Sequence, residues 1–366
     1  MIKHCYIHIP FCKTICSYCD FCKQFYDSQK VKEYLKNLRE EIERDYQGEE
    51  MDTIYIGGGT PTCLSLEELK ELMDILSLIH KSHNTEITIE GNVETISKEK
   101  LVLFKQYGIN RISLGIESIN ENHLRFLERN HTKEQIQKTI QMIRKEGFHN
   151  LNLDLIYAIP GETIEEVQED LDFLLSLQPE HISTYSLMIE DHTKLKIQGV
   201  KPIAEETDEE MYSLITSYLK EKGYIHYEIS NFSKKGYESK HNIGYWKNEE
   251  YYGFGCGASS YKDSIRKTNT RSLTNYPKGN LLEREEVTES DKIEYEILLN
   301  LRLLEGISLS DFEEKYQMPL KDLYNYQQLV EQGLLIEEEN HLRVPEEKIY
   351  VSNEIIVKLL QSKKEI

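Results

Sequence analysis

Four of the chain's seven cysteines lie within eleven residues, in the segment YIHIPFCKTICSYCDFC, at Cys12, Cys16, Cys19 and Cys22. Cysteine thiolates are ligands for soft metals and for iron–sulfur clusters. In a reducing compartment, clustered cysteines are more often ligands than disulfide partners. An odd total also does not suit a fully paired disulfide framework. The segment therefore predicts a metal centre.

The spacing of Cys12, Cys16 and Cys19 is C-x3-C-x2-C. Structural zinc sites take four protein ligands, often from two separated C-x2-C pairs, but Cys63 and Cys256 are isolated downstream. A [4Fe–4S] cubane is favoured, because a short loop can bring thiolates to three of its corners. The fourth iron would then be open to a substrate or cofactor. Zinc and chance spacing are the remaining alternatives.

The loop, with Tyr18 before its third cysteine, resembles the signature of radical S-adenosylmethionine (SAM) proteins. The resemblance implies that Cys12, Cys16 and Cys19 hold three irons. It implies that the fourth iron chelates the amino and carboxylate groups of SAM. In that superfamily, an electron from the cluster cleaves SAM to a 5′-deoxyadenosyl radical.

The motif GGGTP at residues 57–61 is the second part of the resemblance, which implies that Gly58, Gly59 and Thr60 contact the SAM amino group. Glycines let a backbone approach a ligand closely, whereas a tight turn alone would need only one. Further cofactor contacts are implied at or near strand ends, where barrels build their sites. The alternative for several of them is an ordinary polar loop residue. They are Tyr6, Glu90, Glu117, Arg129 and Asp154.

Longer matches extend over nearly the whole chain, including IGGGTPT, LNLDLIYAIPGET and GFGCGASSY. They resemble the oxygen-independent coproporphyrinogen III oxidase-like branch of the superfamily. One function in that branch is a dehydrogenase that oxidatively decarboxylates two propionates. The other is the HemW-type heme chaperone, which binds heme and delivers it to apoproteins. The resemblance implies a [4Fe–4S] cluster, SAM and a porphyrin ligand.

Three features favour the chaperone. Cys12 lies only eleven residues after Met1, and Phe21 stands where the dehydrogenase has a further cysteine. The segment HNIGYW, beginning at His241, matches the chaperone's H-N-x-x-Y-W motif and implies a heme contact. The alternative is that His241 is hydrogen-bonded in a loop beside core aromatics. We expect a heme chaperone; the alternatives are the dehydrogenase and a radical SAM enzyme with another substrate.

Three residues depart from the family's pattern. Cys22 is an extra thiol, which we interpret as a bystander, although it could compete for the open iron. Glu117 stands where glutamine is common, so its charge would alter ligand contacts. Cys256 replaces a residue that is often proline, and we assign it no function.

The composition limits the classes of partner. The 366 residues carry 44 Lys and Arg against 64 Asp and Glu, a formal net charge of −20. That charge disfavours nucleic acid and anionic membranes. No apolar run of about 18 residues or signal region is present, so we expect a cytoplasmic protein without direct membrane insertion. Its expected partners are heme, acceptor apoproteins and an electron donor for the cluster.

The first 190 residues alternate short β-branched runs with stretches of helical periodicity. Strand–helix units in series predict a parallel sheet covered by helices, here an α/β fold with a partial, TIM-like (β/α)6 barrel. Ser65 with Glu68, and Thr163 with Glu166, predict capping boxes at helix starts. Helices are expected at residues 31–46, 66–79, 136–146, 164–177 and 208–222.

The remainder of the chain has a different pattern. YIHYEISNF predicts one strand, and residues 233–284 predict loops and short strands. Three helices at 292–304, 309–316 and 321–332, then a hairpin and a closing helix, predict a winged-helix outline that serves packing or protein contact. The expected divisions are a core barrel at 1–232, an extension at 233–285 and a C-terminal domain at 286–366.

Overall fold

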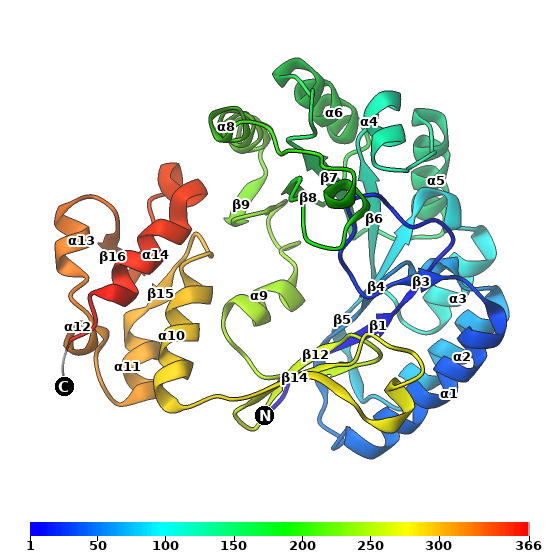
Figure 1. Cartoon of the computed structure of the whole chain (residues 1–366), viewed down its shortest axis with the longest axis horizontal. Helices are drawn as coiled ribbons and strands as arrows, with labels where there is room; N and C mark the ends of the chain where they lie inside the picture. The colour runs from blue at the N-terminus through cyan, green and yellow to red at the C-terminus, as the bar shows by residue number, and fades with distance from the viewer. Residues whose placement is uncertain (365–366) are drawn as a thin grey trace. The chain divides into compact units, whose positions relative to one another are not determined.

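A computed structural model describes residues 1–364 (Figure 1). Contacts divide the chain into two compact units. Unit 1 is Met1–Tyr218 with Glu250–Glu286, and unit 2 is Leu219–Glu249 with Val287–Ile366. The three-part division at 1–232, 233–285 and 286–366 stays a prediction. Residues 365 and 366 of its last part lie outside the described residues.

Unit 1 contains the predicted parallel sheet. Six strands pair in parallel, each with the next in chain order. Their β-branched residues suit a pleated sheet, and those on the buried face form the core. The sheet confirms the partial (β/α)6 barrel. The strands are β1 (His4–Ile9), β4 (Met51–Gly58), β5 (Lys81–Asn92), β6 (Arg111–Glu117), β7 (Leu151–Tyr157) and β8 (His181–Ser186).

Helices α1 to α6 lie on the outer side of this sheet (Figure 1). The predicted capping boxes at Ser65 and Thr163 are both present, and the predicted helices are confirmed with shifted ends. The helices are α1 (Ser28–Asp45), α2 (Leu66–Leu76), α3 (Lys98–Gln106), α4 (Glu121–Phe126), α5 (Lys133–Lys145), α6 (Ile164–Ser176), α7 (Lys194–Ile197) and α8 (Glu205–Glu221).

The sheet also extends past β1, which the sequence did not indicate. Strand β11 pairs in parallel with β1, with Tyr251 opposite His4, and three antiparallel strands follow. The short strands predicted in this segment are therefore an edge of the barrel sheet. They are β11 (Tyr251–Phe254), β12 (Ser259–Lys262), β13 (Ile265–Asn269) and β14 (Leu281–Glu286), with a 3-10 turn, η3 (Tyr276–Lys278), before β14.

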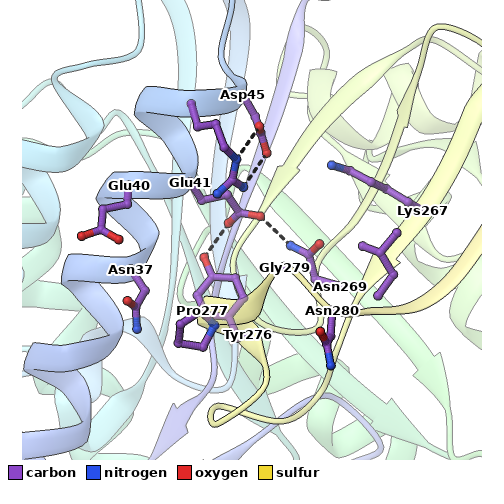
Figure 2. Close-up of a pocket in the computed structure, with 12 residues that line it drawn as sticks. Asn37, Glu40, Glu41, Asp45, Lys267, Asn269, Tyr276, Pro277, Gly279 and Asn280 are labelled. Carbon is purple, nitrogen blue, oxygen red and sulfur yellow. Dashed lines mark hydrogen bonds and ion pairs between the residues drawn. The ribbon is translucent and has the colours of Figure 1, made fainter.

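A buried carboxylate on α1 holds this extension. Glu41 accepts hydrogen bonds from Asn269 Nδ2 at 2.8 Å, Tyr276 Oη at 2.5 Å and the Gly255 amide at 2.7 Å. Figure 2 shows the two side-chain bonds. They lie beside a small hollow of about 70 Å³. Burial raises the pKa of Glu41, and the three donors oppose that rise. A satisfied buried carboxylate of this kind fixes the register of the elements around it.

Unit 2 contains the predicted winged-helix outline, in which the hairpin β16–β17 joins β15 in a three-stranded sheet. Its elements are β9 (Ile225–Glu228), β10 (Asn231–Ser233), α9 (Lys240–Trp246), α10 (Glu289–Asn300), β15 (Ile307–Ser308), α11 (Leu309–Tyr316), α12 (Leu320–Leu323), α13 (Gln327–Glu331), β16 (Ile336–Glu338), β17 (His341–Arg343), η4 (Glu346–Val351) and α14 (Ser352–Gln361).

Three local predictions in unit 2 were wrong. YIHYEISNF forms two antiparallel strands rather than one. The helix expected at 321–332 is broken, because Tyr324 adopts an extended conformation, with φ −133° and ψ 145°, after α12. The HNIGYW segment is helical, since the Ser239 side chain caps the Asn242 amide at the start of α9. Across residues 1–364, no helix has both the length and the apolar character needed to cross a bilayer.

Candidate functional site

Unit 1 contains a cavity of about 540 Å³, a size typical of small-molecule sites. Its lining comes from the cysteine loop, from strands β4, β5, β6, β7 and β8, and from segments that follow them. Ten of the site residues predicted from the sequence line it: Cys12, Cys16, Cys19, Gly58, Gly59, Thr60, Glu90, Glu117, Arg129 and Asp154.

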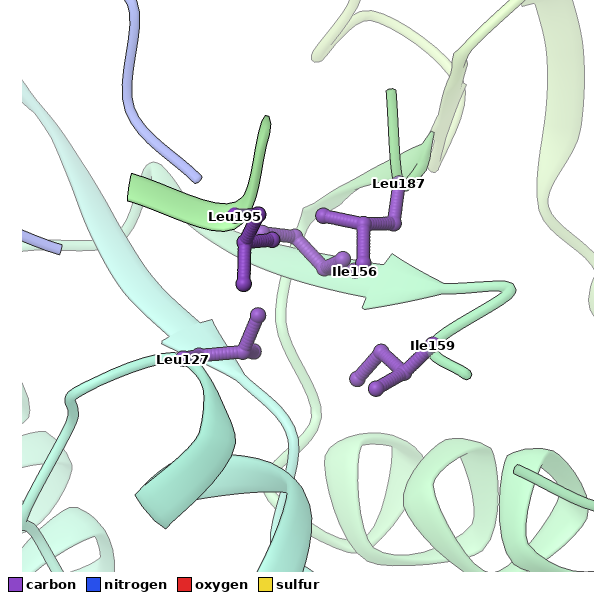
Figure 3. Close-up of a cluster of buried hydrophobic side chains, with 5 residues drawn as sticks. All are labelled: Leu127, Ile156, Ile159, Leu187 and Leu195. Carbon is purple, nitrogen blue, oxygen red and sulfur yellow. The ribbon is translucent and has the colours of Figure 1, made fainter. Parts of the chain in front are cut away.

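The cysteine loop is held at both ends and in its middle. Two short parallel strands, β2 (Phe11–Cys12) and β3 (Gln24–Phe25), close it. In the middle, the Ser17 amide donates to Leu127 O at 3.3 Å, and the Leu195 amide donates to Ser17 O at 3.1 Å. Tyr18 of the loop packs against a cluster of buried apolar side chains. Figure 3 shows this cluster: Leu127, Ile156, Ile159, Leu187 and Leu195.

Burial raises the pKa of all three cysteine thiols, that of Cys12 to about 11. Polar neighbours oppose this rise for each thiol: Arg129 Nη1 lies 3.8 Å from Cys16 Sγ, and Thr60 Oγ1 donates to Cys12 Sγ at 3.6 Å. The positive charge of Lys23 opposes it at Cys19. A bound metal centre would stabilise the thiolates much further. Across residues 1–364, no group of three or more histidine, cysteine or acidic side chains is arranged so that it could hold a single metal ion. Three thiols on one cavity wall are a donor set that fits an iron–sulfur cluster, with one iron for each thiolate.

The GGGTP turn packs directly beneath this loop. A Cβ atom on Gly59 would lie 2.9 Å from Cys12 Sγ and 2.8 Å from Phe11 O. Gly58 has a φ of +116°, and a Cβ there would lie 2.6 Å from the His8 ring. The glycines therefore have a packing reason within the protein itself. Their predicted contact with SAM stays a prediction.

Glu90 at the end of β5 faces the same turn. It accepts hydrogen bonds from the Gly58 amide at 3.1 Å and from Tyr55 Oη at 2.8 Å. Burial raises the pKa of Glu90 to about 7. Tyr6 does not line the cavity, but its ring stacks on that of Tyr55 with centroids 6.2 Å apart.

Glu117 and Arg129 form a buried ion pair at the cavity, with Oε1 and Nη1 3.9 Å apart. Glu117 has a φ of +66°, a left-handed conformation that is costly for a non-glycine residue. Burial raises the pKa of Glu117 to about 7 although Arg129 opposes the rise. Burial would lower the pKa of Arg129, but Glu117 and other acidic groups raise it more. The extra charge at position 117 thus has a partner within the chain.

Two predicted residues reach the cavity from positions other than strand ends. Asp154 lies in the middle of β7 and accepts from Asn152 Nδ2 at 2.7 Å and Ser113 Oγ at 3.3 Å. Burial raises the pKa of Asp154. Arg129 follows α4 and donates from Nη2 to Gly115 O at 2.7 Å. The cavity wall therefore includes strand interiors as well as loops.

The remaining predicted site residue, His241, lies on α9 in unit 2. Its side chain is buried, with the residue 1% exposed, and Nε2 lies 2.8 Å from Tyr245 Oη. The Trp246 carbonyl accepts from Asn300 Nδ2 at 3.1 Å. In this structure the motif is an internally bonded helix.

Tyr55 and His8 are among the residues near the site that were not identified from the sequence. Tyr55 donates to Glu90, and His8 donates from Nε2 to the Cys22 carbonyl at 2.7 Å. His8 Nδ1 also lies 2.9 Å from Tyr6 Oη. The signal for His8 was available, because residues two apart on a strand share a face, and Tyr6 was already a candidate.

Comparisons with known proteins agree with this architecture. Residues 6–174 match the Radical SAM superfamily, and residues 287–351 match the HemN C-terminal domain. A protein described as heme chaperone HemW in Lactococcus lactis is 37% identical over 97% of this chain and 96% of its own length. Its Bacillus subtilis counterpart is 38% identical, over 97% and 98% respectively. The solved structure of Escherichia coli coproporphyrinogen III oxidase (HemN), described as a radical SAM enzyme, shares the fold. It has a TM-score of 0.85 at 22% identity and covers 97% of this chain and 89% of its own.

Proposed function

The chain belongs to the HemW family of radical SAM proteins, and from this premise we propose that it binds heme and transfers the heme to acceptor apoproteins. The observation that supports this function best is similarity over nearly the full length to curated heme chaperones. For the alternative function, a coproporphyrinogen dehydrogenase, the solved structure of HemN is only 22% identical and supports a shared fold alone.

In this proposal, Cys12, Cys16 and Cys19 each hold one iron of a [4Fe–4S] cluster. When bound, the cluster supplies an iron that SAM can chelate through its amino and carboxylate groups, and an electron that can reduce SAM. The chain's own residues orient and enclose these groups. Gly58 and Gly59 would let the backbone lie close to the bound SAM. Arg129 and Glu117 place opposite charges on the cavity wall.

We propose His241 as a heme contact, since imidazole is a common axial ligand. Its Nε2 atom is engaged by Tyr245 Oη in the described structure. A bond from this nitrogen to heme iron would therefore require that hydrogen bond to break. Heme binding through His241 would thus be coupled to a rearrangement of α9.

We also propose that the protein acts in the cytoplasm and draws electrons from a cytoplasmic reductant. The winged-helix unit would serve protein contact rather than nucleic-acid binding, because the net charge is −20. The three-part domain division is kept as part of this proposal.

The test uses the full chain, purified and reconstituted anaerobically, with hemin and coproporphyrinogen III as alternative ligands. We expect near-stoichiometric heme binding, transfer of heme to apomyoglobin as a probe acceptor, and no conversion of the porphyrinogen. His241→Ala is the matched variant for heme binding. Formation of protoporphyrinogen, or failure to bind heme in the cluster-loaded protein, would contradict the chaperone proposal.

A further inference from the structure

Two thiols outside the cluster set face each other in unit 1. Cys22 Sγ lies 3.9 Å from Cys256 Sγ, although the residues are 234 positions apart in sequence. Cys22 is 6% exposed and Cys256 is fully buried. Neither residue lines the cavity. Cys22 Sγ also lies 3.6 Å from the Arg271 carbonyl, and Cys256 Sγ donates to the Thr270 carbonyl at 3.0 Å. The proposed function uses neither thiol.

The scaffold beneath the pair holds both backbones against one residue of β1. His8 Nε2 donates to the Cys22 carbonyl at 2.7 Å. On the other side, the Cys256 amide donates to Tyr34 Oη at 3.2 Å, and Tyr34 Oη donates to the His8 carbonyl. Both cysteines are thus positioned through His8, which makes their proximity a built feature of the fold.

The next residue along the chain shows how closely the two segments approach. A Cβ on Gly257, whose φ is +81°, would lie 2.4 Å from Cys22 Cβ and 2.9 Å from Cys22 Sγ. Only glycine permits this separation between the cysteine loop and the turn after β11. A disulfide has an S–S length of about 2.05 Å, so oxidation requires the sulfurs to approach by a little under 2 Å.

We propose that Cys22 and Cys256 form a redox-active dithiol that small disulfides, such as glutathione disulfide, oxidise to an intramolecular disulfide. Cytosolic disulfides are usually transient and redox-sensing. The Cys22–Cys256 disulfide would link Cys22, three residues after Cys19, to the turn that follows β11 in the extension of the barrel sheet. It would thereby connect the thiol–disulfide balance of the surroundings to the loop that carries the predicted cluster ligands.

Cys22 is the attacking thiol in this exchange. The contact between the two sulfurs lowers the pKa of Cys22 and raises the pKa of Cys256, so Cys22 ionises first. The Cys22 thiolate attacks one sulfur of glutathione disulfide, forming a mixed disulfide and releasing one glutathione thiolate. Cys256 then attacks Cys22 and releases the second. Two electrons pass to glutathione, and the two protein thiol protons end on the two released glutathiones.

The experiment incubates the anaerobically reconstituted full chain in buffers of varied glutathione and glutathione disulfide, then alkylates and digests it without reduction. We expect mass spectrometry to find a peptide linking Cys22 to Cys256, formed as the buffer becomes oxidising and lost on reduction. Cys256→Ser should abolish the link and leave Cys22 as a mixed disulfide with glutathione. Cys22→Ser should leave Cys256 unmodified, which keeps the test informative if one variant folds poorly.

Cys5→Ala is the matched control, because Cys5 is also a buried thiol but lies on β1, outside the pair. It should retain the Cys22–Cys256 link. The proposal is overturned if both thiols stay alkylatable in excess glutathione disulfide while the protein is folded. It is equally overturned if Cys22 links to Cys12, Cys16 or Cys19 instead.

Discussion

The cavity of unit 1 and the motif helix of unit 2 both contain predicted site residues, but they satisfy their polar groups differently. In the cavity, three thiols and the charged groups of Glu90, Glu117 and Asp154 line an open volume of about 540 Å³. In α9, His241 and Tyr245 bond to each other with ring centroids 4.6 Å apart. The three carboxyls have partners within the chain, but together with the thiols they still border open volume that a ligand could fill. The cavity is therefore arranged for a ligand, whereas the motif helix is arranged for its own packing.

The largest expected effect comes from removing a thiol of the unit 1 cavity. Replacing Cys12, Cys16 or Cys19 with alanine should lower the iron content of the reconstituted protein by about tenfold or more, because in the proposed cluster each thiolate would hold a different iron. Iron analysis and the visible absorbance of the cluster measure the loss. Cys22→Ala is the control and should retain its iron, since its thiol faces Cys256. Equal loss in the control would mean that the ligand set is wrong.

The buried ion pair gives the next effect. Arg129→Leu should destabilise the cofactor-free chain by about 3 kcal/mol, because Glu117 would be left buried without its partner. Chemical denaturation measures this change. In a double-mutant cycle with Glu117→Gln, the second substitution should recover part of the loss. Strictly additive effects would show that the two side chains do not interact.

Unit 2 offers a pH test of its own. Burial raises the pKa of Glu228 to about 7 from its ordinary 4.5, so the folded state retains a proton that the unfolded state loses. The stabilisation from the protonated form is complete below about pH 4.5 and is lost as pH rises through 7. Between pH 5 and 8 the loss should be up to about 3 kcal/mol.

The fluorescence of Trp246, the chain's single tryptophan, follows unfolding of unit 2. Glu228→Gln should flatten the pH dependence of that signal, because an amide does not titrate. Circular dichroism of the whole chain is the companion measurement, since Glu90 and Glu117 in unit 1 titrate in the same direction. An unchanged fluorescence slope in Glu228→Gln would refute the assignment of this carboxyl.

Gly59→Ala tests the close packing beneath the cysteine loop. The added Cβ would meet the Phe11 backbone oxygen at 2.8 Å, an atom that cannot move independently. We expect a loss of about 2 kcal/mol in stability, as for an overpacked site, and reduced iron incorporation. Gly48→Ala is the comparison variant: its Cβ would meet nothing within 4 Å, so any loss comes from its φ of +93°, a backbone strain that Gly59 does not have. Wild-type iron incorporation in Gly59→Ala would exclude the steric explanation.

The smallest expected effect concerns the hydrogen bond between His241 and Tyr245 in α9. Tyr245→Phe removes the hydroxyl that lies 2.8 Å from His241 Nε2. Stability should fall by about 1 kcal/mol, while the affinity for heme should rise severalfold if His241 is a heme ligand. Heme titration followed by absorbance measures the second change, and His241→Ala/Tyr245→Phe is the control. Unaltered affinity would argue against a heme bond to His241.

Much of the fold could be predicted because its signals are local. The alternation of apolar runs indicated six parallel strands, and Ser65 with Glu68 marked the start of α2. The short helix α9 was missed because its start depends on one serine cap and only seven residues follow. The pairing of β11 with β1 could not be foreseen, since it joins residues from opposite parts of the sequence.

In the candidate site, too, local features could be predicted and contacts between remote segments could not. The spacing of Cys12, Cys16 and Cys19 is a local pattern, so the cysteine loop could be predicted. Distances between remote segments could not, and the 3.9 Å between Cys22 and Cys256 is one example. The clash that a Cβ on Gly59 would make with Cys12 is another. Sequence patterns indicate the chemistry of a site, whereas the fold decides which remote groups share it.

The most direct test of the account is Mössbauer spectroscopy of the full chain, reconstituted anaerobically with iron-57, before and after addition of SAM. A [4Fe–4S] cluster with one iron whose spectrum changes when SAM is added is the predicted result. Absence of a cubane, or a cubane whose four irons are all unaffected by SAM, would contradict the account.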